Sequence, residues 1–323
     1  MAAARATRYR DRRVRGVIAS VVICTYNRPR MLAGTVRSCL ADATRRGTPY
    51  EIVIADNSVD GHAAPLVASL AGAPVPVRSV RAGPPNISIA RNAGIAASVA
   101  PLVAFLDDDL VVEPGWLDAL IDAIAGGADG AIGPVRPVFE GGAPAWDPAG
   151  ARFTRVLHAP AGTPIVPSAR TPGFVVSTAT SIWRRDTCFT DASPFDPAFG
   201  ASGGEDLDLF LRLERRGRRF VWCPGAGVQE TIPAGRTAWR YQLLRAYSGA
   251  QVYTAAAVRH SDGPGRRAAG IMARGTAQAA IGLLRAAPAA LRGRGLDAAF
   301  MIATGAGKLT WWRTLPLYHI ERT

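Results

Sequence analysis

Three consecutive aspartates, Asp107, Asp108 and Asp109, end an apolar run in the segment FLDDDLVVEPGWL. Neighbouring carboxylates repel one another, so a cation or several hydrogen-bond donors must compensate such a row. Carboxylate oxygens are the ligands that Mg²⁺ and Mn²⁺ prefer, and either ion would neutralise a diphosphate. The alternative is a solvated or helix-capping loop, and these three residues alone leave both interpretations open.

Two other polar segments follow apolar runs nearer the start of the chain. The first can offer backbone amides and a guanidinium to a phosphate or a base, and its residues are Thr25, Tyr26, Asn27 and Arg28. Asp56 ends the second run and can accept hydrogen bonds from a base edge or a ribose hydroxyl, although alone it is as typical of a turn. In open α/β sheets, ligands bind beyond the carboxyl ends of the strands. The polar segments are therefore candidates for a single ligand site.

A second acidic cluster lies roughly 100 residues further on, in GGEDLDLFLRL. Glu205 and Asp206 follow two glycines and begin a helical pattern, where acids complement the helix dipole. The same position suits a general base, because the glycines leave it accessible and the dipole keeps it ionised. The dipole also lowers basicity, so Glu205 or partial desolvation would have to restore it. Spacing alone leaves both roles open.

The elements that must position these residues follow an alternating pattern in the first half of the chain. β-Branched runs predict strands at 17–24, 50–56, 75–80 and 101–109, and helical spacing predicts helices at 29–46, 64–72, 87–99 and 113–127. Pro114 suits the first turn of the last helix and Gly126 its end. Strands that alternate with helices over short connections predict parallel βαβ units in a three-layer α/β fold.

The pattern changes after Ala128. The remaining chain predicts one strand at 128–139, a Pro- and Gly-rich loop up to residue 173, a strand and then a turn at 173–186, a helix at 205–217, a strand at 218–224 and helices from residue 236 onward. We therefore divide the chain into a basic tail at 1–16, an α/β domain at 17–232 and a helical extension at 233–323.

Composition limits the class of protein. The chain has 323 residues, 48% of them hydrophobic and 20% charged, which is typical of an ordered globular protein. Its net charge of +13 favours anionic partners such as nucleotide phosphates, nucleic acid or an acidic membrane surface. The four cysteines show neither CxxC spacing nor a nearby histidine, which argues against zinc and against a disulfide framework. No apolar run is long enough to predict a membrane span.

Five segments carry most of these polar residues in a fixed order, and they are VVICTYNRPRML, EIVIADNS, ISIARNAGI, FLDDDLVVEPGWL and FDPAFGASGGEDLDLFLRLERRG. In this order they resemble the motifs of the inverting family-2 glycosyltransferases with the GT-A fold. The resemblance implies a Rossmann-like three-layer αβα domain with a mostly parallel sheet, followed by a C-terminal helical extension. It also implies metal-dependent transfer of a sugar from a nucleoside diphosphate, UDP being the expected one. The acceptor would be a hydroxyl of a glycan or lipid-linked molecule in cell-surface polysaccharide or glycoconjugate synthesis.

By this resemblance, the donor nucleotide would bind to the segment Thr25–Arg28 and to Asp56, with Arg91 and Asn92 behind them. Asp107 would contact the ribose or the metal.

The same resemblance assigns the metal and the base. Asp107 and Asp109 match the ends of the DXD motif, so Asp109 would be the main ligand of Mg²⁺ or Mn²⁺. Asp108 lies in the donor site between them and receives no separate role. Asp206, from the ED motif, would deprotonate the acceptor hydroxyl, and Glu205 would contact the acceptor or the base.

The chain departs from the family pattern in the segment GVQETIP. Some relatives carry a metal-binding histidine there, whereas this chain offers Glu230. Its carboxylate can also bind a hard cation, or it can pair with Arg236 instead.

Two other functions stay open at this point. A nucleotidyltransferase that builds a sugar nucleotide shares the sheet and the aspartates, but it would normally show a Gly-rich signature after the first strand. A basic module without catalytic activity could bind nucleic acid or membrane through its arginines.

We expect a cytoplasmic enzyme without a nucleic-acid partner. Its Arg- and Trp-containing C-terminal segments fit either the inner face of the cell membrane or an ordinary solvated surface.

Overall fold

The computed structural model describes residues 16–42, 47–168, 175–291 and 295–316. The basic tail expected at 1–16 and the last turn of the helix expected at 29–46 fall almost entirely outside the described residues.

A central sheet forms the middle of the molecule. In spatial order its strands are β3 (Val77–Arg81), β2 (Tyr50–Asp56), β1 (Ala19–Thr25), β4 (Leu102–Asp107), β9 (Thr180–Arg184), β6 (Gly130–Ile132), β10 (Phe220–Trp222) and β8 (Pro164–Ile165). The first four strands are parallel, as are β6 and β10. β9 is antiparallel to both of its neighbours, and β8 is antiparallel to β10. The expected mostly parallel sheet is confirmed.

The register of the first strands brings the polar segments together. Every residue of β1 and β2 is buried, as expected for strands that helices cover on both faces. Thr25 lies opposite Asp56, and Cys24 lies opposite Asp107. The three polar segments therefore leave the sheet side by side, at its carboxyl edge.

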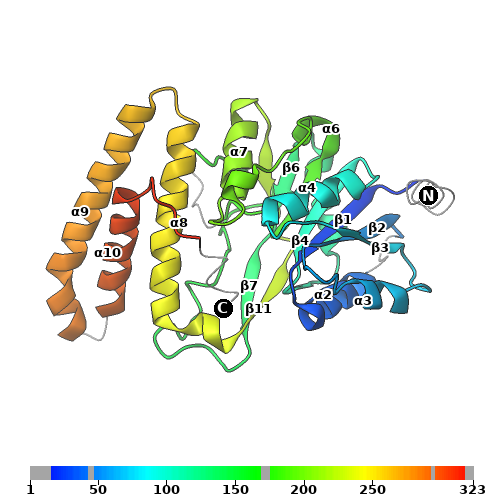
Figure 1. The fold of residues 1–323 in the computed structure, drawn as a ribbon, viewed down its shortest axis with the longest axis horizontal. Helices are drawn as coiled ribbons and strands as arrows, with labels where there is room; N and C mark the ends of the chain where they lie inside the picture. Colours follow the sequence, from blue (N-terminus) through cyan, green and yellow to red (C-terminus); the bar gives the residue numbers. More distant parts are fainter. Residues whose placement is uncertain (1–15, 43–46, 169–174, 292–294, 317–323) are drawn as a thin grey trace.

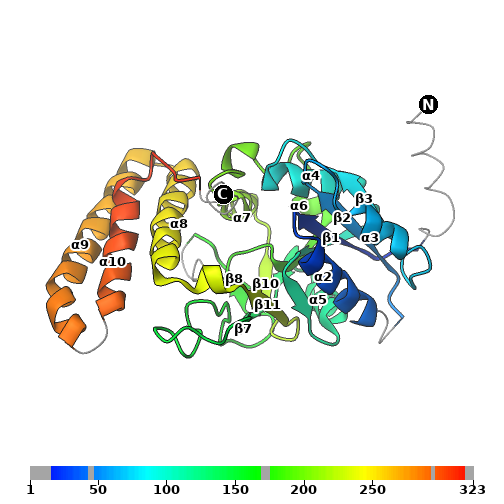
Figure 2. The same cartoon turned by 60° about the horizontal axis from the view of Figure 1, so that its bottom comes forward.

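Helices cover both faces of this sheet (Figures 1 and 2). One face carries α2 (Pro29–Asp42), α3 (Ala64–Ser69) and α5 (Trp116–Ala125), and the other carries α4 (Ile87–Ala97) and α7 (Glu205–Arg215). Alternate residues of β1 point to opposite layers, so Val21 and Ile23 join the first core and Val22 joins the second. The three-layer αβα architecture of a GT-A domain is thus present.

The start of α5 differs from the prediction. The helix begins at Trp116, so Pro114 precedes it instead of occupying its first turn. Gly115 is the N-cap and adopts a left-handed conformation, with φ of 83°, that separates the proline from the helix. Gly126 is the C-cap, as expected.

The prediction of a single strand at 128–139 is wrong. The chain instead forms β6 in the central sheet and β7 (Val135–Phe139) in a second sheet with the order β5 (Leu110–Val112), β11 (Val228–Ile232), β7. Gly133 separates the two strands, and a Cβ at this position would overlap the carbonyl of Ala226. Close backbone packing therefore redirects the chain at this glycine.

The C-terminal part is helical, as expected. The short helices α6 (Arg185–Cys188), η1 (Pro197–Phe199) and η2 (Ala234–Thr237) precede three long ones, α8 (Trp239–Arg259), α9 (Pro264–Leu291) and α10 (Gly295–Leu309). In both views α8 stands nearest the αβα domain and α10 lies between α8 and α9 (Figures 1 and 2). Within the described parts of the chain, no helix has the length and hydropathy needed to cross a membrane.

Candidate functional site

Asp108 joins the loop after β1 to the aspartate row. Its carboxylate accepts hydrogen bonds from Thr25 Oγ1 at 2.7 Å and Arg28 Nη1 at 3.3 Å, and its backbone carbonyl accepts one from Thr35 Oγ1 at 2.8 Å. Burial raises the pKa of this carboxyl to about 6, although Arg28 opposes the shift. The geometry gives Asp108 the separate role that the sequence did not suggest, because it fixes Thr25 and Arg28 beside the row.

Asp56 shapes the loop that follows β2. Its two carboxylate oxygens accept hydrogen bonds from the backbone amides of Ser58 at 3.0 Å and Ala63 at 2.8 Å. Ser58 Oγ in turn accepts one from the backbone amide of Asn27 at 2.9 Å, next to the half-buried Tyr26. The loops after β1 and β2 are thereby held together, and each Asp56 oxygen keeps a lone pair for a ligand.

Arg91 connects the two acidic clusters. This buried side chain of α4 places Nη1 in contact with Glu205 Oε1 and 2.7 Å from Asp206 Oδ1, while Nη2 lies 3.9 Å from Asp107 Oδ1. Its guanidinium also lies over the ring of Phe195. The aspartate row and the start of α7 are therefore parts of one site.

Asp206 is held in a defined orientation. Its two oxygens accept hydrogen bonds from Thr178, one from Oγ1 at 2.9 Å and one from the backbone amide at 3.0 Å. Glu205 is more deeply buried, and its Oε2 has no hydrogen-bond partner among the described residues. Burial raises the pKa of the Glu205 carboxyl to about 7, against the opposing effect of Arg91. Asp206 is thus the more accessible of the two acids.

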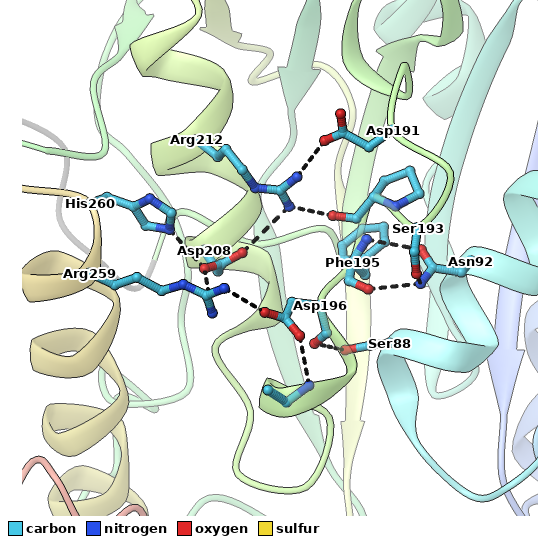
Figure 3. Close-up of polar contacts among 12 residues, drawn as sticks. Ser88, Asn92, Asp191, Ser193, Phe195, Asp196, Asp208, Arg212, Arg259 and His260 are labelled. Atoms are coloured by element: carbon cyan, nitrogen blue, oxygen red, sulfur yellow. Dashed lines mark hydrogen bonds and ion pairs between the residues drawn. The ribbon is translucent and has the colours of Figure 1, made fainter.

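Asn92 makes contacts away from this site. Its amide nitrogen donates to Ser193 Oγ at 2.7 Å and to the carbonyl of Phe195 at 2.8 Å, and its oxygen accepts from the Phe195 amide at 2.9 Å (Figure 3). The contacts fix the segment before α7 against α4.

Asp109 and Glu230 lie among arginines from three separate segments. Asp109 Oδ2 is 3.3 Å from both Arg28 Nη1 and Arg236 Nη1. Glu230 Oε2 accepts a hydrogen bond from Arg155 Nη2 at 2.6 Å. The sequence analysis named Arg28 and Arg236 but missed Arg155, which lies in the irregular loop after β7, where no pattern marks it.

The carboxylates offer hard oxygen donors that crowd one another. Burial raises the pKa of Asp107 to about 7, with Arg91 opposing and Asp109 adding to the shift. The pKa of Asp109 is itself raised by burial and by Glu230. Among the residues that the structure describes, no group of three or more His, Cys, Asp or Glu side chains could hold a metal ion by itself. The donors fit a cation that completes its ligands with phosphate and water, as Mg²⁺ commonly does.

Known proteins with similar sequences are glycosyltransferases or act in polysaccharide synthesis. Residues 102–317 match the model for glycosyl transferase family group 2, and residues 20–177 match that for glycosyl transferase family 2. The succinoglycan biosynthesis protein ExoM of Rhizobium meliloti (strain 1021) is 34% identical over 233 residues, which are 72% of each chain. The pre-mycofactocin glycosyltransferase of Mycobacterium tuberculosis is 32% identical over 180 residues, covering 54% of this chain and 35% of that protein.

Solved structures show the same fold at low sequence identity. TarS 1–349 of S. aureus superposes with a TM-score of 0.53 in its complex with UDP-GlcNAc and 0.52 in its complex with UDP, at 16% and 15% identity. Both comparisons cover 88% of this chain and 90% of TarS 1–349. With its family matches, its relatives and its αβα domain, the chain belongs to glycosyltransferase family 2 and has the GT-A fold.

Proposed function

We propose that this glycosyltransferase moves a sugar from a nucleoside-diphosphate sugar, with UDP as the nucleotide, to an acceptor hydroxyl, and inverts the anomeric carbon. The observation that carries the proposal is the Arg91 bridge, because one guanidinium joins Asp107 at the sheet edge to Asp206 on α7. The UDP and UDP-GlcNAc complexes of TarS support the choice of nucleotide. Family membership also argues against the nucleotidyltransferase and the non-catalytic module.

The donor would bind at the carboxyl edge of the sheet. The base and ribose would contact the loops that Asp56 and Thr25–Arg28 form, and the diphosphate would lie over Asp107 and Asp109. Arg28, Arg155 and Arg236 surround that position and would offset the negative charge of the phosphates.

Asp206 would act as the general base. It takes the proton from the acceptor hydroxyl while the oxygen forms its bond to the anomeric carbon and the sugar–phosphate bond breaks on the opposite side. A single displacement of this kind inverts the configuration. No protein acid is required, since the nucleoside diphosphate is already a good leaving group. Glu205, buried beside Asp206 and paired with the same Arg91, would contact the base.

A divalent cation would bind Asp109 and Asp107, with Glu230 as a further ligand. When bound, Mg²⁺ or Mn²⁺ would supply neutralisation of the diphosphate charge. Support comes from the mutual repulsion of these carboxylates, which a cation would relieve.

We place the acceptor in cell-surface glycan synthesis, as a glycan or lipid-linked sugar, because the ExoM relative acts in succinoglycan biosynthesis.

We also propose a peripheral position on the inner face of the membrane, because the C-terminal helical extension carries an excess of positive charge. Residues 233–323 hold 13 Lys and Arg against three Asp and Glu. Leu283 and Leu284 of α9 are 65% and 80% exposed. Sedimentation with vesicles of anionic and neutral lipid tests this, and equal failure to bind both would contradict it.

Asp206→Asn tests the proposed function directly. Thermal shifts with a panel of nucleoside diphosphates and nucleotide sugars, with and without Mn²⁺, first identify the ligand. Asp206→Asn should keep that shift and lose roughly 10³-fold in kcat, within the range that a general base contributes. Wild-type turnover in this variant would refute the role of Asp206, and the absence of any nucleotide shift would refute the donor site.

A further inference from the structure

α7 carries a second buried acid, Asp208, which the proposed chemistry does not use. Its side chain is 2% exposed, and its Oδ1 lies 2.8 Å from Nε2 of His260 and 3.6 Å from Nη1 of Arg259. Its Oδ2 lies 3.5 Å from Nη2 of Arg212 (Figure 3). A buried carboxylate requires such partners. Asp208 therefore ties the C-terminal end of α8 to the first turns of α7.

Arg259 extends this connection to the segment that precedes α7. Its Nη2 lies 2.8 Å from Asp196 Oδ2, and its guanidinium lies over the ring of Phe199. Asp196 Oδ1 also caps η1 by accepting the Ala198 amide, and the Asp196 carbonyl accepts a hydrogen bond from Ser88 on α4. One arginine thus contacts both α7 and the segment leading into it (Figure 3).

The start of α7 also packs directly on α8. Gly204 is the N-cap of α7 with φ of 94°, and a Cβ there would overlap the side chain of Val252 on α8. Asp206 lies only two residues beyond this contact. Thr178 and Arg91 hold its carboxylate. A rotation of the first turn of α7 would therefore move Asp206 relative to any bound acceptor.

We propose that His260 and Arg259 are positioning residues for sugar transfer. By holding Asp208 and Asp196, they fix the first turn of α7 so that the Asp206 carboxylate faces the acceptor hydroxyl. The inference rests on the proposed role of Asp206 as general base. The end of α8 would then help to orient the general base, in addition to any contact that it makes with acceptor or membrane.

His260→Ala removes the 2.8 Å contact with Asp208 without touching the donor loops. We expect kcat to fall about tenfold, as misplacement of a catalytic group does. The affinity for UDP, measured by calorimetry, should change less than twofold. His260→Gln, whose side-chain amide can donate to Asp208, should recover most of the lost kcat. In an Asp206→Asn background, His260→Ala should cause no further loss of the residual rate, because His260 acts through Asp206.

Asp262→Ala is the matched control. Asp262 pairs with Arg215 at 2.6 Å and so links the chain just after α8 to the far end of α7. This variant should keep kcat within twofold of the wild type. Should His260→Ala fail to fold, Arg259→Gln, at a side chain that is half exposed, replaces it with the same expectations.

Three results would overturn the proposal: unchanged kcat in the folded variant, an equal loss of kcat in Asp262→Ala, or a loss of UDP affinity as large as the loss of kcat. Full activity of Asp206→Asn alone would instead refute the proposed base, whatever His260→Ala does. The two failures are therefore distinguishable.

Discussion

The two acidic clusters of the molecule are compensated in different ways. At the aspartate row, Arg28 and Arg236 reach Asp109 from separate segments, and Arg28 stays 34% exposed. At the start of α7, a single guanidinium that is 6% exposed, from Arg91, serves both Glu205 and Asp206. A partly exposed arginine can move into solvent when a cation or a diphosphate binds to its carboxylate. A buried arginine has no access to solvent and stays paired. The first cluster is therefore suited to ligand exchange and the second to a fixed geometry.

Removing the Arg91 guanidinium, which Glu205 and Asp206 share, should have the largest effect on the second cluster. Arg91→Met leaves Glu205, Asp206 and Asp107 without a common cation, and the free energy of unfolding should fall by about 3–5 kcal/mol. Transfer should be lost as well. Denaturant titration and an activity assay measure both effects. Arg91→Lys retains charge without the planar fork and should be intermediate. Native stability in Arg91→Met would show that the second cluster does not depend on Arg91.

The pH dependence of stability sharpens the description of the second cluster. Burial raises the pKa of Glu205 to about 7 from an ordinary value of 4.5. The stability that the protonated form contributes is full below pH 4.5 and is lost as pH rises through 7. The free energy of unfolding should therefore decline over this interval. Denaturation across this range should give a shallower decline for Glu205→Gln. Parallel curves for the two proteins would contradict the prediction.

In the first cluster, removing a carboxylate should weaken donor binding without lowering the stability of the protein. Asp109→Ala removes a carboxylate whose pKa is raised by burial and by Glu230. Without metal, the melting temperature should therefore stay the same or rise. Because charge neutralisation at the diphosphate is lost, kcat/KM should fall about 100-fold. Calorimetry of UDP with and without Mn²⁺ should show that the metal-dependent part of the affinity has gone. A melting temperature that drops with full Mn²⁺ dependence retained would reverse the contrast between the clusters.

A smaller change tests how rigidly Asp206 is held. Thr178→Val deletes one hydrogen bond to the carboxylate and keeps the one from the backbone amide. A single bond of this kind contributes about 1 kcal/mol, so kcat should fall roughly fivefold. Thr178→Ser preserves the hydroxyl and serves as the control. If both variants have the same kcat, the hydroxyl does not orient Asp206.

β1 and β2 could be predicted closely because helices cover both of their faces. β2 begins and ends at Tyr50 and Asp56, the limits that the sequence predicts. The division between β6 and β7 could not be foreseen, since it depends on how closely Gly133 packs against Ala226, nearly a hundred residues away in the chain. Local pattern carries no information about such a contact.

Most acids of the site could be predicted because they end or follow a strand or begin a helix. Their partners could not be predicted in full. Arg155 lies in a loop without periodicity, and only the folded chain brings it to Glu230. Asn92 follows Arg91 directly and both contact Phe195, yet Arg91 pairs with Asp206 whereas the contacts of Asn92 are with the segment before α7, because successive residues on a helix do not face the same way.

The order of these residues along the chain also has a consequence for synthesis. Every strand of both sheets is complete at Ile232, before Arg236, Arg259 and His260 have left the ribosome. The nucleotide-facing edge can therefore form on a growing chain whose general base is not yet braced. We expect a nascent chain at that stage to bind donor but to transfer its sugar more slowly, so that full activity requires the translation of α8.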